Sequence, residues 1–296
     1  MARVLPVEFK EIPWRVPVSV VHPAIFWQWS AYHCENVIET ILPAGHAIGC
    51  RRFRRPWSES QETVSPTQHS VRSLTLDIIE AIRDRASTRA FVDRDVSKEV
   101  IEGVLDTARW APSGVNTQPW QVAVVTGDTK QRIGDALAQA RSSQQVPNPD
   151  YKYYADRFPE PYRSRQKACG FDLYGALGIE RDDQDARMVQ WLKNYHGFGA
   201  PVELLVFVDA VLETGSWIDV GMFIQNVMLA ARGHGLETCA QASMAEYPDI
   251  VRGILDLPDS MSLVCGVAVG FADNKDPVNN YRTEREPVES FTTWYG

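Results

Sequence analysis

The sequence predicts an α+β domain, because two kinds of apolar pattern alternate along the chain. VELLVFVD at 202–209 and SLVCGVAVG at 262–270 are short, nearly continuous apolar runs, which are typical of core strands covered on both faces. The stretch 217–234 has apolar residues at helical spacing and is also apolar on its other side. Such a helix must be buried, so we expect it at the centre of the domain or against a second subunit.

The remaining elements follow from spacing and capping residues. Residues 75–84 have a helical pattern, and Ser97 is a good N-cap for the helix that follows it. QVAVVT at 121–126 predicts a strand. Asp128 is expected to cap a further helix that runs to about Arg141.

Residues 142–195 form a long section rich in tyrosine, arginine and aspartate, which we expect to be partly helical. Two interpretations stay open. One is a mobile cover whose aromatic rings bracket a planar substrate. The other is a surface excursion whose tyrosine rings are buried. The aromatic residues in question are Tyr151, Tyr153, Tyr154, Tyr162, Tyr174 and Trp191.

The N-terminal part of the chain differs from the rest. Residues 1–70 hold four of the nine tryptophans and four of the six histidines, and prolines interrupt them often. They show no sustained periodicity of either helix or strand. We therefore expect 1–72 to be an atypical N-terminal extension, disordered or not part of the fold, followed by one domain over 73–296.

Composition excludes several classes of partner. A formal net charge of −8 argues against nucleic acid, and no apolar stretch approaches the 18 or so residues of a membrane span. The five cysteines are odd in number and lack metal-ligand spacing, which argues against a disulfide framework and against a metal site. With no secretory signal, the expected compartment is a reducing cytoplasm.

The segment RASTR at 85–89 carries two arginines around a hydroxyl group. If it is extended, Arg85, Ser87 and Arg89 project to the same side and would hold a phosphate dianion. Alternatively, the arginines only complement the C-terminal end of a helix dipole. Arg285, in REP near the C-terminus, indicates nothing alone.

A second segment, APSGVNTQPW at 111–120, lies between a predicted helix and a predicted strand. Backbone amides are free at such a junction, and polar side chains there can point at a ligand. The alternative is a simple helix stop and turn.

Three segments of this chain occur in the same order and spacing as three segments of the FMN-dependent nitroreductase family. They are RASTR for R-x-S-x-R/K, PSGVNTQPW for PS-x-x-N-x-QPW, and REP for R-x-P. Residues 75–296 therefore resemble that family. GSWIDVGMFIQNVMLAARGHGL at 215–236 is similar to the subgroup of p-nitrobenzoate and other nitroaromatic reductases. The resemblance implies a central mixed sheet flanked by helices, in an intertwined homodimer with two FMN sites at the subunit interface.

The resemblance also implies which residues bind the cofactor. Arg85, Ser87, Arg89 and Arg285 would hold the FMN phosphate and ribityl end. Ser113 and Asn116 would lie along the flavin. The other implied contacts are a ring-contacting amide at Asn194 and the stretch 238–243 near flavin N5, with Ala240 and Gln241. Many relatives have glutamate and glycine where this chain has Ala242 and Ser243.

The activity implied is hydride transfer from NADH or NADPH through FMN to a small nitroaromatic acceptor, in ping-pong turnover. The flavin carries the chemistry, so no catalytic side chain and no metal are expected. GFGAP and GHGLET lack the third glycine of a dinucleotide fingerprint, so the nicotinamide would be a visiting substrate.

Other functions remain open on the same scaffold. The acceptor could equally be a quinone, an enone or a halogenated phenol, because the fold fixes the flavin and not the acceptor. A flavin-binding sensor or carrier without turnover is a further alternative, as is a structural protein without a cofactor.

Overall fold

The computed structural model of the protein describes residues 76–296. The expectation for residues 1–72 therefore concerns a part of the chain outside the described residues. Residues 76–296 fall within one compact unit. Within this part of the chain, no helix is long and apolar enough to cross a membrane.

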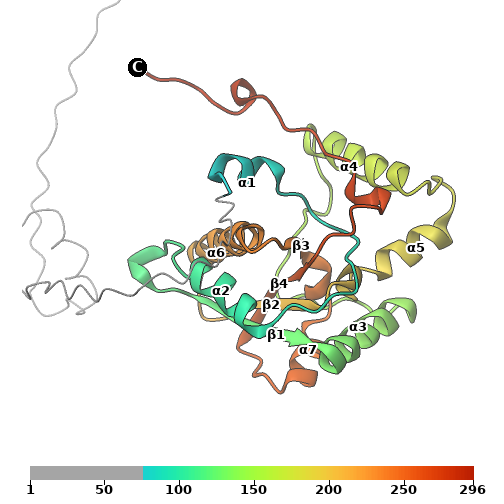
Figure 1. Ribbon diagram of the computed structural model, residues 1–296, viewed down its shortest axis with the longest axis horizontal. Helices are drawn as coiled ribbons and strands as arrows, with labels where there is room; N and C mark the ends of the chain where they lie inside the picture. The colour runs from blue at the N-terminus through green and yellow to red at the C-terminus, as the bar shows by residue number, and fades with distance from the viewer. Residues whose placement is uncertain (1–75) are drawn as a thin grey trace, which may run out of the picture. The chain divides into compact units, whose positions relative to one another are not determined.

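Four strands form the central sheet in the order β1-β2-β4-β3 (Figure 1). Each neighbouring pair is antiparallel. The mixed sheet implied by the family resemblance is therefore not found among the described strands, where the parallel pairing is limited to one isolated bridge between Ser87 and Thr238. The strands are β1 (Trp120–Thr126), β2 (Val202–Asp209), β3 (Glu237–Gln241) and β4 (Met261–Gly270).

Helices cover both faces of the sheet, so the fold is α+β, as predicted (Figure 1). On one face lie α2 (Lys98–Ala108) and α6 (Thr214–Gly233), and on the other lie α3 (Gly127–Ser142) and α7 (Pro248–Leu255). Side chains of β2 alternate between the two cores, which explains why this strand is apolar throughout.

The element predictions hold for the strongly patterned segments. The prediction for 202–209 matches β2, and those for 121–126 and 262–270 each miss one residue at the start. The Ser97 side chain accepts a hydrogen bond from Val100 N, so it caps α2 as predicted.

The predicted capping role of Asp128 is wrong. The N-cap of α3 is Thr126, and Asp128 lies in the first turn, where a carboxylate favours the helix dipole.

The section 142–195 is partly helical, as expected. It contains α4 (Tyr162–Ala176) and α5 (Gln184–Leu192), and α4 has no buried residue. The section is anchored near its start. The Asp150 carboxylate accepts hydrogen bonds from Arg252 Nη1 at 2.7 Å and from Leu263 N at 2.9 Å.

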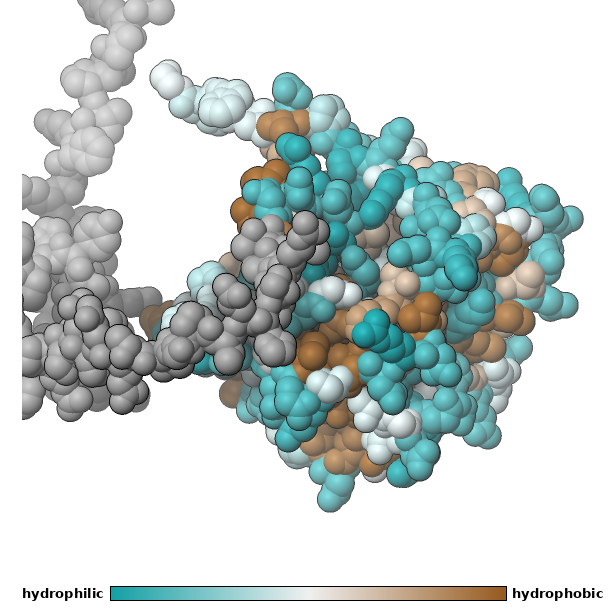
Figure 2. Space-filling view, in the orientation of Figure 1, coloured by the Kyte–Doolittle hydropathy of each residue, from teal (hydrophilic) through white to brown (hydrophobic). Residues whose placement is uncertain are grey.

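Two helices leave apolar side chains uncovered in the single chain. Helix α6 buries Val220, Phe223 and Val227 against the sheet, but Ile218 on the same helix is 65% exposed. Helix α1 (Ile78–Asp84), which packs on α6, exposes Ile78, Ile79 and Ile82. Apolar side chains reach the drawn surface at several places in Figure 2. An apolar face of this kind favours contact with another protein surface.

Candidate functional site

Two cavities adjoin between the RASTR segment and the middle of α4. The first, which we call the arginine cavity, has a volume of about 690 Å³ and is lined by residues that include Arg85, Ser87, Arg89, Arg282 and Arg285. The second, the aromatic cavity, has a volume of about 540 Å³. Arg89 and Cys169 line both cavities, so the two form adjoining parts of one site.

The arginine cavity is built on an extended segment that follows α1. Thr88 N donates to Thr238 O at 3.0 Å, so residues 85–89 run beside β3. Arg89 N donates to the Asn279 side chain at 2.8 Å, and Arg89 Nη1 donates to Tyr281 Oη at 3.0 Å. These bonds hold the RASTR segment against the C-terminal residues that complete the cavity.

Positive charge gathers on this cavity. Burial lowers the pKa of Arg85, and the neighbouring Arg285 and Arg282 lower it further. Arg285 Nη1 is fixed by the carbonyl and hydroxyl oxygens of Thr283, at 3.1 and 2.7 Å. Asp84 is the acidic residue on the lining. Guanidinium groups that repel one another this closely favour a bound dianion, and a phosphate fits their geometry.

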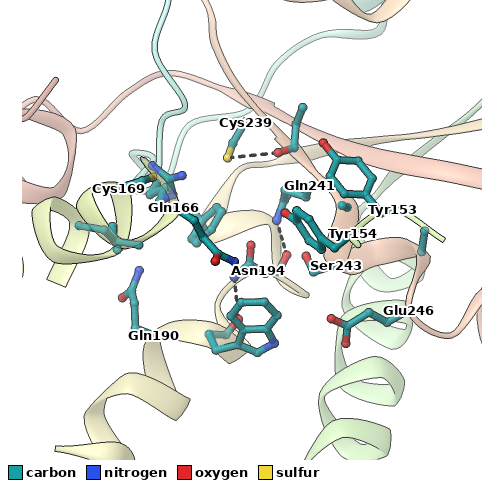
Figure 3. Close-up of a pocket in the computed structure, with 18 of the residues that line it drawn as sticks. Tyr153, Tyr154, Gln166, Cys169, Gln190, Asn194, Cys239, Gln241, Ser243 and Glu246 are labelled. Carbon is teal, nitrogen blue, oxygen red and sulfur yellow. Dashed lines mark hydrogen bonds between the residues drawn. The ribbon is translucent and has the colours of Figure 1, made fainter. Parts of the chain in front are cut away.

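The floor of the aromatic cavity is the end of β3 and the 3₁₀ helix η4 (Ala242–Ala245) that follows it. Gln241 Nε2 donates to Asn194 O at 2.5 Å, and Asn194 Nδ2 donates to Trp191 O at 2.9 Å (Figure 3). Gln241 Oε1 and Ser243 Oγ are buried and have no hydrogen-bond partner within residues 76–296. Buried polar atoms of this kind are suited to a polar planar ligand.

The section 142–195 provides the wall of this cavity. Tyr153 and Tyr154 lie on one side of it, while Gln166 and Cys169 of α4 lie on another (Figure 3). Tyr151 behaves differently, because its hydroxyl donates to Val264 O at 2.6 Å and its ring packs on Trp217. Tyr153, Tyr154, Tyr174 and Trp191 line the cavity, as the interpretation as a cover requires, whereas Tyr162 does not. Tyr151 lines it too but is half-buried and bonded to β4, as the interpretation as buried rings requires.

The site residues suggested by the sequence divide into two groups. Arg85, Ser87, Arg89 and Arg285 line the arginine cavity, and Asn194, Ala240 and Gln241 line the aromatic cavity. Ser113 and Asn116 line neither cavity.

Ser113 and Asn116 belong to a separate, outward-facing loop. Ser113 Oγ accepts from Gln118 N at 3.0 Å, and Gly114 N donates to Asp219 of α6. Val115, Asn116 and Gln118 have φ values of 45°, 59° and 48°, and Val115 is 90% exposed. Three non-glycine residues in the left-handed region store backbone strain, which is typical of functional loops.

Sequence reasoning missed Arg282 and Cys169. Arg282 lies three residues before Arg285 in the same segment, and that proximity was the available signal. Cys169 lies on α4, whose weak helical pattern gave no register for assigning its faces. Over residues 76–296, no group of three or more His, Cys, Asp or Glu side chains could hold a metal ion.

Comparison with known proteins gives consistent matches. The profile described as Nitroreductase family matches residues 82–271. Nitrobenzene nitroreductase of Ectopseudomonas oleovorans is 38% identical over 218 residues, which cover 73% of this chain and 96% of the relative. The 4-nitrobenzoate reductase of Pseudomonas putida is 38% identical over 224 residues, or 75% of this chain and 97% of that protein.

Solved structures agree with these matches. The FMN- and NADPH-dependent nitroreductase NfnB from Sphingopyxis sp. strain HMH is 39% identical with a TM-score of 0.73, and the match covers 75% of this chain and all of that one. FMN-dependent NfnB from Mycobacterium smegmatis, solved in complex with NADPH, is 32% identical with a TM-score of 0.70. That match covers 74% of this chain and 97% of the other.

Proposed function

The chain belongs to the nitroreductase family, and from this premise we propose that it passes hydride from NADPH or NADH through FMN to a nitroaromatic acceptor. The observation that carries the proposal is the pair of adjoining cavities, one lined by arginines and one by aromatic and amide groups.

The residues present fit FMN. Arg85, Arg89, Arg282 and Arg285 would hold the phosphate through charge-assisted hydrogen bonds, with the Ser87 hydroxyl beside them. Two buried polar atoms that lack a partner among the described residues, Gln241 Oε1 and Ser243 Oγ, would meet polar atoms of the ring. When bound, the flavin supplies the hydride chemistry, and the protein binds, orients and shields it.

The cover formed by 142–195 excludes water and selects flat molecules. Tyr153 and Tyr154 pack edge to face with ring centroids 4.5 Å apart, on the wall of the cavity. The glycine-containing segments GFGAP and GHGLET lack the third glycine of a dinucleotide-binding fingerprint, so a separate nicotinamide-binding domain is not expected. Donor and acceptor therefore use the same cavity in turn, which leads to ping-pong kinetics.

We further propose that two copies form an intertwined homodimer. In that dimer the loop 111–119 of one copy, with Ser113 and Asn116, lies along the flavin held by the other. Support comes from the outward-facing loop and from the exposed apolar residues of α1 and α6. The C-terminal segment adds to it, since it leaves the body in Figure 1 and exposes Phe291, Trp294 and Tyr295.

The acceptor class rests on the relatives that reduce nitrobenzene and 4-nitrobenzoate. The reducing cytoplasm remains our proposed compartment, supported by free thiols at Cys169, Cys239 and Cys265.

One experiment tests the activity directly. The purified protein should be yellow, NADPH or NADH should bleach it without air, and 4-nitrobenzoate should then restore the colour. If a quinone restores the colour quickly while nitrobenzene derivatives do not, the acceptor assignment is wrong and the quinone reductase alternative replaces it. Failure to bleach would instead favour a flavin carrier.

A further inference from the structure

One buried carboxyl group has no place in the proposed chemistry. Glu203 lies on β2, in a run that is otherwise apolar, and is 1% exposed. Neither Oε1 nor Oε2 has a hydrogen-bond partner within residues 76–296. Burying an unpaired carboxylate is expensive, so the chain must accommodate this group in another way.

Two glycines make the space that the Glu203 carboxyl occupies. A Cβ atom placed on Gly197 would lie 2.6 Å from Glu203 Oε2, and one placed on Gly266 would overlap Oε1. Gly197 also has a φ of +58°, which a larger residue rarely adopts. The fold therefore fits closely around a carboxyl at position 203.

The charged and titratable groups around Glu203 are few. Lys130 of α3 is the nearby cation, and its Nζ donates to His196 O at 2.8 Å. The thiols of Cys239 on β3 and Cys265 on β4 also sense the charge of Glu203. His196 lies 3.8 Å from the exposed carboxylate of Asp135. Burial raises the pKa of Glu203 to about 8, against a smaller opposing effect of Lys130.

The position of Glu203 relates it to the aromatic cavity. Glu203 pairs across the sheet with Ala268, and Ala268 pairs with Cys239, which lines the cavity. Because neighbouring strands lie about 4.8 Å apart, the Cα atoms of Glu203 and Cys239 are about 10 Å apart. Phe198, next to Gly197, also lines the cavity. Phe198 and Cys239, which line the cavity, form a small apolar cluster with Ala268, the cross-strand partner of Glu203.

We propose that Glu203 takes up a proton from solvent when a flavin in the aromatic cavity is reduced, and so makes the reduction potential fall more steeply with pH over the range in which Glu203 titrates. The inference rests on the proposed function, since it requires FMN in that cavity. The two electrons go to the flavin and add negative charge there, while Glu203 changes only from carboxylate to carboxylic acid. If the charge on the flavin lies about as far from the carboxyl as Cys239 lies from Glu203, about 10 Å, an effective dielectric constant near 20 makes the coupling change the proton affinity of Glu203 about tenfold.

The test is the midpoint potential of the FMN-loaded protein from pH 6 to 10, measured against redox dyes of known potential. Wild type and Glu203→Gln should give parallel lines below about pH 7, where the carboxyl is protonated in both redox states. Between about pH 8 and 9, the wild-type potential should fall more steeply than that of Glu203→Gln, by about 15 mV per pH unit, because about half a proton accompanies the two electrons there. Above about pH 9 the two lines should again be parallel, separated by about 30 mV, which corresponds to the tenfold change in proton affinity. Glu102→Gln, an exposed change on α2, is the matched control and should follow wild type.

A second variant guards against misfolding of Glu203→Gln. Lys130→Met removes the nearby cation, so the pKa of Glu203 should rise further and the steep region should move to higher pH. Wild type and Glu203→Gln lines that stay parallel over the whole range would overturn the inference, as would an unmoved steep region in Lys130→Met. A protein that retains no flavin would instead contradict the proposed function, before any potential is measured.

Discussion

The RASTR segment and the loop 111–119 are both short polar motifs, but the chain places them differently. Residues 85–89 are bonded inward, to β3 and to Asn279, and their side chains line a cavity of the same chain. The loop 111–119 is bonded to α6 through Gly114 N and Asp219 and otherwise mainly within itself, and its tip faces outward with three left-handed non-glycine residues. A motif can therefore mark ligand-binding residues without telling which copy of the chain they serve.

The difference has a physical origin. An extended segment beside a strand satisfies its backbone through the sheet, so its side chains keep a fixed direction. A loop whose backbone is strained and whose side chains are exposed has little to stabilise it within one chain. We expect a second copy to provide the missing contacts, and the predictions below test that contrast.

The largest effect should follow from breaking the dimer. Ile218 is exposed in the single chain, so Ile218→Glu should leave the fold intact but place a charge in the proposed interface. We expect a monomer with FMN affinity reduced about a hundredfold or more, since each flavin would lose the partner's loop and much of its burial. Size-exclusion chromatography with light scattering and flavin absorbance measures both properties.

Val146→Glu is the matched control for this change, because Val146 is 82% exposed and lies outside α1 and α6. It should remain dimeric and yellow. A monomeric Ile218→Glu protein with full FMN occupancy would show that each chain forms a complete flavin site alone.

Removal of an inward-facing cation should have the next largest effect. Arg89→Ala deletes a group that lines both cavities and donates to Tyr281. Loss of a charge-assisted hydrogen bond amounts to about 1.5–3 kcal/mol, which is roughly ten- to a hundredfold in FMN affinity. Fluorescence titration of the apoprotein with FMN measures it. Arg132→Ala changes an exposed arginine on α3 and should bind FMN like wild type, and equal affinities in both variants would argue against the phosphate assignment.

The loop should contribute less than the arginine. Asn116→Ala removes a neutral amide, so we expect about 0.5–1.5 kcal/mol, or roughly two- to tenfold in FMN affinity. Refolded mixtures of Arg89→Ala and Asn116→Ala chains sharpen the comparison. If each site combines Arg89 of one copy with Asn116 of the other, a mixed dimer has one intact site and one doubly impaired site. Binding would then show one class of wild-type affinity, whereas two impaired classes would place both residues in the same chain's site.

Sequence reasoning succeeded where local physics determines the outcome. β2 and α2 have unambiguous patterns or caps, and both were located from the sequence. β3 was missed as a strand because ETCAQ is short and mixed in polarity, and its pairing with β4 comes from tertiary contacts. Helix α4 has no buried face, so no periodicity marked it.

The candidate site shows the same limit. Arg85, Arg89 and Arg285 were found through the family resemblance, yet their convergence depends on Asn279 and Tyr281, which tie the C-terminal segment to RASTR. Glu203 was read only as part of an apolar strand. Its burial follows from two glycines that are 6 and 63 residues away in sequence. Contacts between such distant positions have no signal in a single sequence.

The smallest effect should come from the cover over the aromatic cavity. Tyr154 packs on Tyr153 and Phe158 and stays 58% exposed, so Tyr154→Ala should leave the fold and the flavin in place. An aromatic contact contributes about 0.5–1.5 kcal/mol beyond burial, which predicts a two- to tenfold rise in the KM for nitroaromatic acceptors. Tyr154→Phe keeps the ring and should stay close to wild type.

Steady-state kinetics with both substrates varied tests the role of Tyr154 and the shared use of the aromatic cavity, because ping-pong turnover gives parallel lines in double-reciprocal plots. In Tyr154→Ala the lines should remain parallel, and kcat/KM should fall mainly for the acceptor, since the ring is expected to stack on the flat nitroaromatic. An equal fall for NADPH and for the acceptor would show that Tyr154 positions the flavin itself. Intersecting lines would mean that donor and acceptor occupy separate places, which would contradict the shared use of the aromatic cavity.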